Sequence, residues 1–444
     1  MDQIVSECEK LCLDINDKGV ATHFDECDPL KGFRSKFKIP QVTDPSTNAI
    51  KSGVYLLGNS LGMQPKSARS YIDDELKKWE DHGVEAYFVK KNSWYEYDER
   101  CSNQLAELVG AKPSEVAIMA SLTANLHFMM TSFFRPTSDR YKILMEDGAF
   151  PADAIAVRSH IHSRDLSPDD ALILVKPRDG EYLIREEDIL SLIRKHGHEI
   201  ALVFIGGVNY FTGQVFDAEI ITKLAHSYGC IVGFDFAHGV GNIKLNIHEW
   251  DIDFAVWCTY KYLNSGPGGI GCIFVHERHA NDTSRPRLAG WWTHERNTRF
   301  LMKPELIPTP GALGYQISSP PILCIATLKA SLDIFSEAGL DALIVKSKRL
   351  TGYMQLLIEA LDTKNKVKII TPTDESKRGC QLSLIFSATS AKLILDALLS
   401  EGVFCDFREP NCIRVAPVPL YNTFADVYDF VSLLMKLINQ YCDE

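Results

Sequence analysis

A lysine and an aspartate stand at positions in the sequence where charged side chains are unusual. Lys261 lies inside WCTYKYLNSGPGG (residues 257–269), among aromatic and apolar residues, and Asp235 ends the apolar run CIVGFD. Both residue types are rarely buried unless another group compensates their charge. The two positions are 261 − 235 = 26 residues apart, which is enough chain for one connection between neighbouring strands.

Two kinds of site use such a pair. One is a structural ion pair. The other is a pyridoxal phosphate site, in which a lysine amine forms a Schiff base with the cofactor and a carboxylate keeps the pyridine nitrogen protonated. Burial favours the neutral amine, which Schiff-base chemistry requires. Spacing alone leaves both interpretations open.

Three other stretches carry residues that this cofactor uses. Leu122 and Thr123 open a helical pattern directly after a strand, where backbone amides bind phosphate, although Thr123 is equally suited to be a simple helix cap. Phe150 follows another strand and can stack on a flat ring or belong to the core, and Asp153 comes three positions later. Tyr260 precedes the lysine and can reach a phosphate oxygen or pack in the interior.

The stretch GPGGIG (266–271) has the G-x-G-x-x-G spacing of a dinucleotide-binding loop. That spacing has mechanical meaning only where it opens a helix after a strand. Here it precedes another apolar strand pattern, GCIFVH, so the match is accidental. The glycines instead predict a tight turn and a close approach of the backbone to a neighbouring group.

Seven short apolar runs predict the strands that position these residues. They are continuous rather than alternating, which is typical of strands buried on both faces. Amphipathic stretches alternate with them, so the sequence predicts an α/β fold, and Asp235 falls at the carboxyl end of its strand, where open α/β sheets bind ligands. The runs cover residues 115–119, 141–146, 171–175, 201–207, 230–236, 254–260 and 271–276.

We expect three parts in the chain: an N-terminal segment (1–64) that packs across both domains, a large cofactor-binding domain (65–325) and a smaller C-terminal α/β domain (326–444). In the large domain, residues 67–83 predict a helix. Its apolar face consists of Ala68, Ile72, Leu76 and Trp79. The small domain begins with a helix over 326–360 and closes with one that Thr423 can cap. The inward stripe of that last helix is Phe424, Val427, Val431, Leu434 and Ile438.

Composition narrows the class of protein. The 444 residues carry a net charge of −11, without a basic stripe, which argues against nucleic acid or an anionic membrane as a partner. We expect no membrane-spanning segment and no secretory signal. The 12 cysteines are scattered singly, several inside apolar runs, which is typical of reduced cysteines in a cytoplasmic (cytosolic) protein. We assign no metal ligands.

Eight motifs together resemble the kynureninase family, in order and spacing, from about residue 54 to 440. They are GNSLGMQPK, LTANLH, FPAD, FDFAHGVGN, CTYKYLNSGPGG, GWWTHE, SSPPIL and IRVAPVPLYN. The resemblance implies the pyridoxal-phosphate transferase (aminotransferase-like, type I, class V) fold, with a mainly parallel seven-stranded sheet and a smaller C-terminal domain. It also implies a homodimer that uses pyridoxal 5'-phosphate.

The resemblance implies a role for each motif residue. Lys261 forms the imine and takes the substrate's α-proton, Asp235 faces the pyridine nitrogen, and Tyr260 relays a proton. Arg414 receives the substrate's α-carboxylate; the plainer alternative is a surface salt bridge. The implied cofactor-binding residues are Leu122, Thr123, Phe150, Pro151, Ala152, Asp153, Gly206, Asp235, His238, Tyr260, Lys261, Trp291 and Ser319, the last two acting across the dimer interface. The implied substrate-binding residues are Arg414, Asn59, Ser60 and His238.

The implied reaction is hydrolysis of the Cβ–Cγ bond of L-kynurenine, 3-hydroxy-L-kynurenine or both, in tryptophan catabolism and de novo NAD biosynthesis. The products are anthranilate or 3-hydroxyanthranilate and L-alanine. Ser319 replaces an expected asparagine, Gly206 an expected serine, and Tyr87 a substrate-facing histidine; these departures bear on the preference for the aryl ring. The alternatives are a cysteine desulfurase, with Cys324 or Cys412 as nucleophile, an aminotransferase, or a catalytically silent binding protein on the same scaffold.

Overall fold

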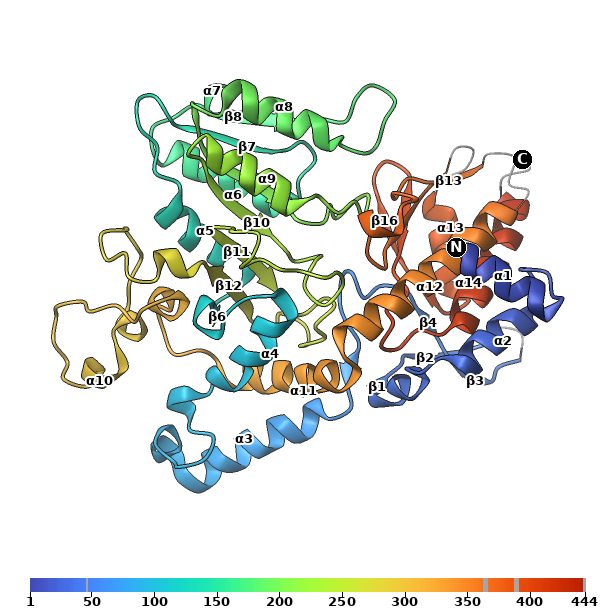
Figure 1. The fold of residues 1–444 in the computed structure, drawn as a ribbon. Coiled ribbons are helices and arrows are strands. Elements are labelled where there is room, and N and C mark those ends of the chain that lie inside the picture. The colour runs from blue at the N-terminus through green and yellow to red at the C-terminus, as the bar shows by residue number, and fades with distance from the viewer. Residues whose placement is uncertain (45–46, 362–365, 387–390, 442–444) are drawn as a thin grey trace. The chain divides into compact units, whose positions relative to one another are not determined.

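A computed structural model describes residues 1–44, 47–361, 366–386 and 391–441. The chain divides into two compact units (Figure 1). The larger unit comprises residues 68–210 and 216–332, and the smaller unit comprises residues 1–67, 211–215 and 333–444. Among the described helices, none is both long and apolar enough to cross a membrane.

The larger unit is built on a seven-stranded sheet in the order β6-β12-β11-β10-β9-β7-β8. All strands run parallel except β12, which is antiparallel to both of its neighbours. The predicted α/β fold class is thereby confirmed, and each of the apolar runs forms one strand. The strands are β6 (Val116–Ile118), β7 (Lys142–Glu146), β8 (Leu172–Val175), β9 (Ile200–Gly206), β10 (Ile231–Asp235), β11 (Phe254–Cys258) and β12 (Gly271–Val275).

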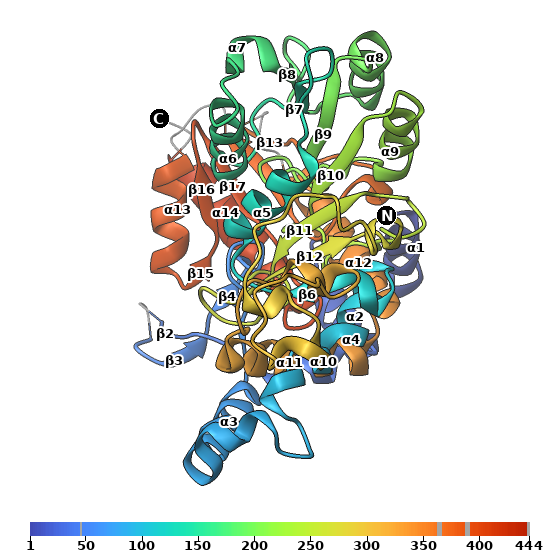
Figure 2. The same ribbon diagram turned by 90° about the vertical axis from the view of Figure 1, so that its left-hand side faces the viewer.

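Helices cover both faces of this sheet. On one face lie α5 (Leu122–Phe133) and α6 (Pro151–His162), and on the other lie α8 (Glu186–His196) and α9 (Ala218–Ser227) (Figure 2). The core is close-packed: a Cβ added to Gly233 in β10 would lie 2.2 Å from the ring of Phe254, its partner in β11. The other helices of this unit are α3 (Ala68–His82), α4 (Glu99–Val109), α7 (Pro168–Ala171) and α10 (Arg296–Arg299).

Two sequence expectations for the larger unit are wrong in detail. The strand expected over 254–260 ends at Cys258, because the chain closes a tight loop in which the N–H of Ser265 donates to the carbonyl of Thr259 at 3.1 Å. Lys261 therefore lies in this loop and not on a strand. On α3, Leu76 and Trp79 are 42% and 62% exposed.

The buried side chain near the middle of α3 is a carboxylate, that of Glu75. Glu75 is only 4% exposed and accepts hydrogen bonds from Trp94 Nε1 and Tyr97 Oη, both at 2.8 Å. A charged residue that finds enough partners is buried in preference to the apolar residue beside it.

The smaller unit combines an antiparallel sheet with long helices. The sheet has the order β13-β14-β17-β16. The helix expected over 326–360 is two, because Gly339 (φ 77°) breaks it. The last helix, α14, is capped as predicted, with the N–H of Asp426 donating to Thr423 Oγ1 at 3.0 Å, and its predicted stripe is buried. The N-terminal helices α1 and α2 contact α12 and α14 respectively.

The elements of the smaller unit, with the helix that leads into it, are α1 (Asp2–Leu11), α2 (Lys18–Cys27), β1 (Phe37–Lys38), β2 (Gln41–Thr43), β3 (Ile50–Ser52), β4 (Val54–Tyr55), β5 (Gln64–Pro65), α11 (Ile322–Ala338), α12 (Leu340–Ala360), β13 (Val367–Ile369), β14 (Leu382–Phe386), α13 (Ala391–Ser400), β15 (Val403–Phe404), β16 (Asp406–Arg408), β17 (Cys412–Val415) and α14 (Phe424–Tyr441).

Candidate active site

The amine of Lys261 lies where strands β10 and β11 end. Its Nζ atom is 2.9 Å from Nε2 of His238, a residue of the loop after β10, and 5.8 Å from the centroid of the Phe150 ring. The side chain of Lys261 is half-buried, whereas His238 is buried. Phe150 is 39% exposed, so its ring is available to a ligand and is not sealed in the core. The structure thus brings together three of the residues expected at the site.

Two buried aspartates belong to this site. Asp235, the last residue of β10, is 7% exposed, and its Oδ1 accepts the N–H of Ala237 at 2.7 Å. Burial raises the pKa of Asp235, and the charge of Lys261 opposes that rise. Asp153, in the first turn of α6 after Pro151 and Ala152, has a pKa raised well above its ordinary value by burial and then by Asp235. Asp153 therefore keeps its proton and donates it to Asp235, while its buried Oδ1 has no hydrogen-bond partner.

A third carboxyl group, which the sequence reasoning missed, lies beside Gly206. Glu146 ends β7, is 4% exposed, and accepts the N–H of Gly206 at 3.0 and 3.2 Å. Burial raises the pKa of Glu146 to about 7. A Cβ at position 206 would lie 2.8 Å from Glu146 Oε1, so the serine expected there would require the carboxylate to shift. The signal for Glu146 was available: like Asp235, it is a carboxylate at the end of an apolar strand.

The start of α5 offers the expected place for a phosphate. The helix begins at Leu122 after Ser121, so Thr123 lies inside the first turn and is not the cap. Ala120, just before it, has a φ of 44°, which non-glycine residues rarely adopt. Gly271 packs closely here, because a Cβ on it would lie 3.1 Å from the backbone nitrogen of Leu122.

The glycine-rich stretch and Tyr260 belong to the same corner. Gly266 and Gly268 have positive φ and form a turn, and strand β12 follows, which confirms that the stretch is no dinucleotide loop. Gly271 pairs with Cys258 of β11, two residues before Tyr260. Burial, together with Cys258, raises the pKa of the half-buried Tyr260, so its hydroxyl stays protonated.

Trp291, Ser319 and Tyr87 gather in a separate pocket of the larger unit. This cavity of about 550 Å³ is lined by aromatic side chains that include Phe88 and Phe300. Trp291 is 48% exposed, and the buried Oγ of Ser319 has no hydrogen-bond partner. Two of the sequence departures, at 87 and 319, therefore face one cavity, whose lining does not include Lys261.

Arg414, Asn59 and Ser60 lie together in the smaller unit. Arg414, on β17, is 1% exposed, which contradicts the alternative that it forms a surface salt bridge. Its Nε donates to Asp406 Oδ1 at 2.8 Å, and its Nη2 donates to Asp406 Oδ2 and to Ser60 Oγ at 3.1 Å. Asn59 Nδ2 donates to Gln381 Oε1 at 2.9 Å, and the buried Oδ1 of Asn59 has no partner.

Asp406 was not expected from the sequence. Burial raises its pKa, but the hydrogen bonds and charge of Arg414 outweigh burial and hold the pKa below its ordinary value. The carboxylate is therefore ionised, and it fixes the orientation of the guanidinium through a two-point contact.

Comparison with known proteins gives consistent results. Residues 343–434 match the family model described as the kynureninase C-terminal domain. The chain is 50% identical to a kynureninase of Myxococcus xanthus over 93% of this chain and 96% of that protein. It is 46% identical to a kynureninase of Homo sapiens (95% and 93%) and 46% identical to one of Rattus norvegicus (99% and 97%).

Solved structures show the same fold at low sequence identity. A cysteine desulfurase from Thermococcus onnurineus has a TM-score of 0.73 at 17% identity, covering 87% of this chain and 95% of its own. A variant of the protein C-DES, with glycine covalently linked to its pyridoxal phosphate cofactor, has a TM-score of 0.73 at 15% identity (86% and 96%). At these identities the likeness concerns the fold alone.

Proposed function

The chain belongs to the kynureninase family, and from this premise we infer its reaction. It hydrolyses the Cβ–Cγ bond of L-kynurenine or 3-hydroxy-L-kynurenine and releases anthranilate or 3-hydroxyanthranilate together with L-alanine. The reaction belongs to tryptophan catabolism and to de novo NAD biosynthesis. The enzyme is a hydrolase that depends on pyridoxal phosphate.

The residues at the carboxyl ends of β10 and β11 fit this cofactor. Lys261 offers an amine for the aldehyde, Asp235 a buried carboxylate for the pyridine nitrogen, and Phe150 an exposed ring face. The unpartnered Oδ1 of Asp153 calls for a further donor in the same place, and the start of α5 offers amides for the phosphate. This gathering around Lys261 is the observation that carries the proposal. When bound, the cofactor supplies an electron sink for the charge left on the substrate's α-carbon.

The chain's own residues supply the proton transfers. We assign the removal of the substrate's α-proton to Lys261 Nζ. This atom lies 2.9 Å from His238 Nε2, which orients the amine. Asp153 keeps its proton and donates it to Asp235, which stabilises Asp235 as a carboxylate. Tyr260 keeps its phenolic proton, and we assign to it the delivery of that proton while water adds to the aryl ketone. General acid–base groups of this kind contribute about 10²–10⁴-fold in rate.

Substrate recognition is assigned to the Arg414 cluster, and a dimer contact to the aromatic pocket. We assign the substrate's α-carboxylate to the guanidinium of Arg414, which Asp406 and Ser60 hold in place. We propose that the chain forms a homodimer, in which Trp291 and Ser319 of each copy serve the other copy's phosphate site. Exposed apolar side chains near these residues support the dimer: Val84, Phe88, Trp291 and Phe300 are 48–71% exposed.

The cysteines support a reducing, cytosolic compartment and disfavour desulfurase chemistry. Cys230, Cys258 and Cys272 are buried and form no disulfide. Burial raises the pKa of Cys324, and it raises that of Cys412 to about 12, so neither thiol is an activated nucleophile.

Steady-state kinetics on kynurenine and 3-hydroxykynurenine, measured side by side, test the proposal. We expect anthranilate fluorescence from kynurenine and release of alanine in equal amount. Release of sulfide from cysteine, without cleavage of either kynurenine, would instead assign the chain to the desulfurases.

A further inference from the structure

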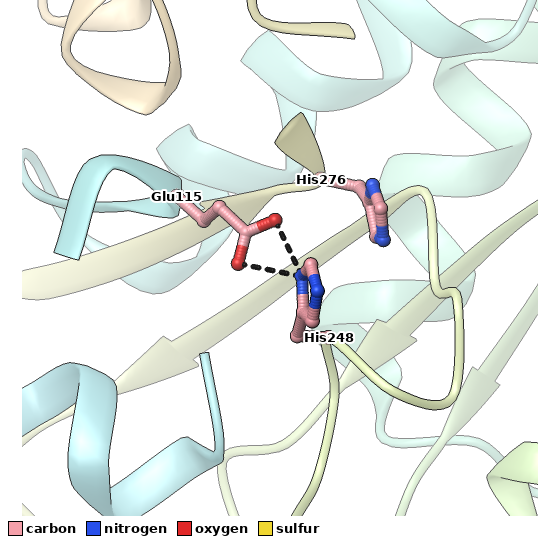
Figure 3. Close-up of side chains that lie close together, drawn as sticks. All are labelled: Glu115, His248 and His276. Carbon is pink, nitrogen blue, oxygen red and sulfur yellow. Dashed lines mark hydrogen bonds and ion pairs between the residues drawn. The ribbon is translucent and has the colours of Figure 1, made fainter. Parts of the chain in front are cut away.

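Three potential metal ligands meet at the edge of the large sheet opposite to Asp235 and Lys261. Glu115 directly precedes β6, His276 directly follows β12, and His248 lies in the connection between β10 and β11. One ligand atom from each of them lies within 4.8 Å of the other two (Figure 3). The three positions are far apart in the sequence, so no spacing pattern predicts the cluster.

The backbone holds two of the three ligands in place. The carboxylate of Glu115 is fully buried and accepts the N–H groups of Lys112 and Glu277, each at 2.8 Å. His248 is fixed through its own backbone, because its N–H donates to the carbonyl of Gly110 at 3.1 Å. A ligand set that is already ordered loses little entropy when an ion binds.

Each of the two imidazoles has a carboxylate beside one of its ring nitrogens. Nδ1 of His248 lies 2.9 and 3.1 Å from the two oxygens of Glu115, and the ring of His276 stacks on that of His248 with centroids 4.9 Å apart. Nδ1 of His276 accepts the N–H of Arg278 at 3.2 Å. Asp251 brings a further carboxylate to His276, at 3.4 Å from its Nε2. A carboxylate behind an imidazole is the usual support of a metal-bound histidine.

The cations nearby are already paired and do not oppose a bound ion. Lys112 forms an ion pair with Glu277 at 2.6 Å. Arg278 is paired with Asp253 at 2.8 Å and also contacts Asp251. A divalent ion at the cluster would thus meet the buried carboxylate of Glu115 while Lys112 and Arg278 are paired with carboxylates of their own.

We propose that Glu115, His248 and His276 bind one divalent first-row transition metal ion. Two imidazoles and one carboxylate are ligand types that Zn²⁺ takes, at about 2.0–2.2 Å from each ligand atom. Because the two rings are stacked within 10° of parallel, they must rotate out of the stack to bind one ion. The ion ties the β10–β11 connection to the edge strand β6 and to its neighbour β12. Because the length of β11, about 15 Å at the usual rise per residue, separates it from Lys261, its role is structural and independent of turnover.

The test counts metal in the holoenzyme. The protein is treated with a chelator, dialysed against Zn²⁺ and measured for bound metal and for turnover of kynurenine. We expect wild type to retain one Zn²⁺ per chain and to unfold at a higher temperature with Zn²⁺ than without it. His248→Gln and His276→Gln are expected to lose that ion and that thermal shift but to keep turnover. His162→Gln, at an exposed histidine of α6, is the matched control and should retain both. Wild type without bound zinc, or ligand variants that keep it, would overturn the proposal.

Replacement by Co²⁺ identifies the ligands even where a variant fails to fold. Binding through two imidazoles and a carboxylate gives visible d–d absorption without an intense thiolate charge-transfer band. Within the described residues, Cys27 Sγ lies 3.7 Å from His23 Nε2 and is a competing pair that contains a thiol. A thiolate band in wild type that disappears in Cys27→Ser would place the ion there and contradict the assignment.

Discussion

An aspartate is buried at each of the two ends of the strands in the large sheet, and the pKa values of these two aspartates are shifted in opposite directions. Asp235, at the carboxyl edge, is 7% exposed, shares its surroundings with two other carboxyl groups, and has a raised pKa. Asp253, at the start of β11 on the opposite edge, is 2% exposed. Burial raises its pKa too, but hydrogen bonds from His226 and His279 and the charge of Arg278 outweigh burial and hold it far below the ordinary value.

The difference distinguishes a structural carboxylate from a functional one. Asp253 already contacts His226, Arg278 and His279, so it stabilises the fold and leaves no position for a ligand. The half-buried amine of Lys261 lowers the pKa of both Asp235 and Asp153, but burial outweighs it at both, so the positive charge at this site does not compensate the two carboxyl groups. A cofactor with a protonated ring nitrogen supplies further positive charge at this site.

The largest expected effect follows from removing the amine at the carboxyl edge. Lys261→Ala should lower kcat for kynurenine by at least about 10⁴-fold, because the amine both binds the cofactor and moves the α-proton. The visible absorbance of the bound cofactor should disappear as well. Lys195→Ala, at an exposed lysine of α8, is the control and should leave both unchanged. A Lys261→Ala variant that keeps colour and turnover would refute the site.

The same substitution at the two aspartates sharpens the comparison. Asp235→Asn should reduce kcat by about 10²–10⁴-fold with little loss of stability, since it removes the charge that serves the ring nitrogen. Asp253→Asn should leave the cofactor spectrum unchanged and lower the free energy of unfolding by about 1.5–3 kcal/mol, because Arg278, His226 and His279 lose the charged acceptor that they share. Denaturant unfolding and absorbance spectra of both variants separate the two effects; equal losses of stability would break the distinction.

The pH dependence of stability should also differ between the edges. Glu146 has a folded-state pKa of about 7, above its ordinary 4.5, so it favours the folded state fully below pH 4.5, and this contribution is lost as pH rises to about 7. The loss amounts to about 3 kcal/mol. The lowered pKa of Asp253 acts in the opposite sense: its contribution is present above pH 3.8 and is lost only below it.

Glu146→Gln isolates the first of these effects. Urea unfolding of the cofactor-free protein at pH 5 and pH 7.5 should show a fall in stability for wild type that is about 2 kcal/mol larger than for the variant. Parallel pH profiles for wild type and Glu146→Gln would show that this carboxyl group has an ordinary pKa.

The smallest expected effect concerns Arg414, whose pairing with Asp406 resembles that of Asp253. Arg414→Ala should raise KM for kynurenine by about 10–100-fold, which corresponds to a charged hydrogen bond, and should leave cofactor retention nearly unchanged. Asp406→Asn should produce a weaker effect in the same direction. Dialysis against buffer and absorbance report the cofactor; its loss in parallel with substrate binding would make Arg414 a structural residue.

The sequence predicted the sheet and half of its site because these depend on local patterns. Continuous apolar runs specify buried strands, and a carboxylate at the end of such a run marks Asp235. Glu146 carries the same mark, but its closeness to Gly206 depends on the pairing of β7 with β9, which the sequence does not state. The Arg414–Asp406 pair and the Glu115 cluster likewise arise from strand neighbours in space.

The exposed face of α3 shows a second limit. Leu76 and Trp79 have the spacing of an inward stripe, yet within one chain Glu75 takes the buried position because Trp94 and Tyr97 donate to it. Amphipathic spacing identifies a helix, but it does not say whether its apolar face is buried by the same chain.

The central claim is that Lys261 holds the cofactor at the carboxyl edge of the sheet, and chemical trapping tests it most directly. The holoenzyme is reduced with borohydride, digested, and mapped by mass spectrometry. We predict a pyridoxyl group on the peptide that contains Lys261 and on no other peptide. A label on a different lysine, or a protein that retains no cofactor to trap, would contradict the account.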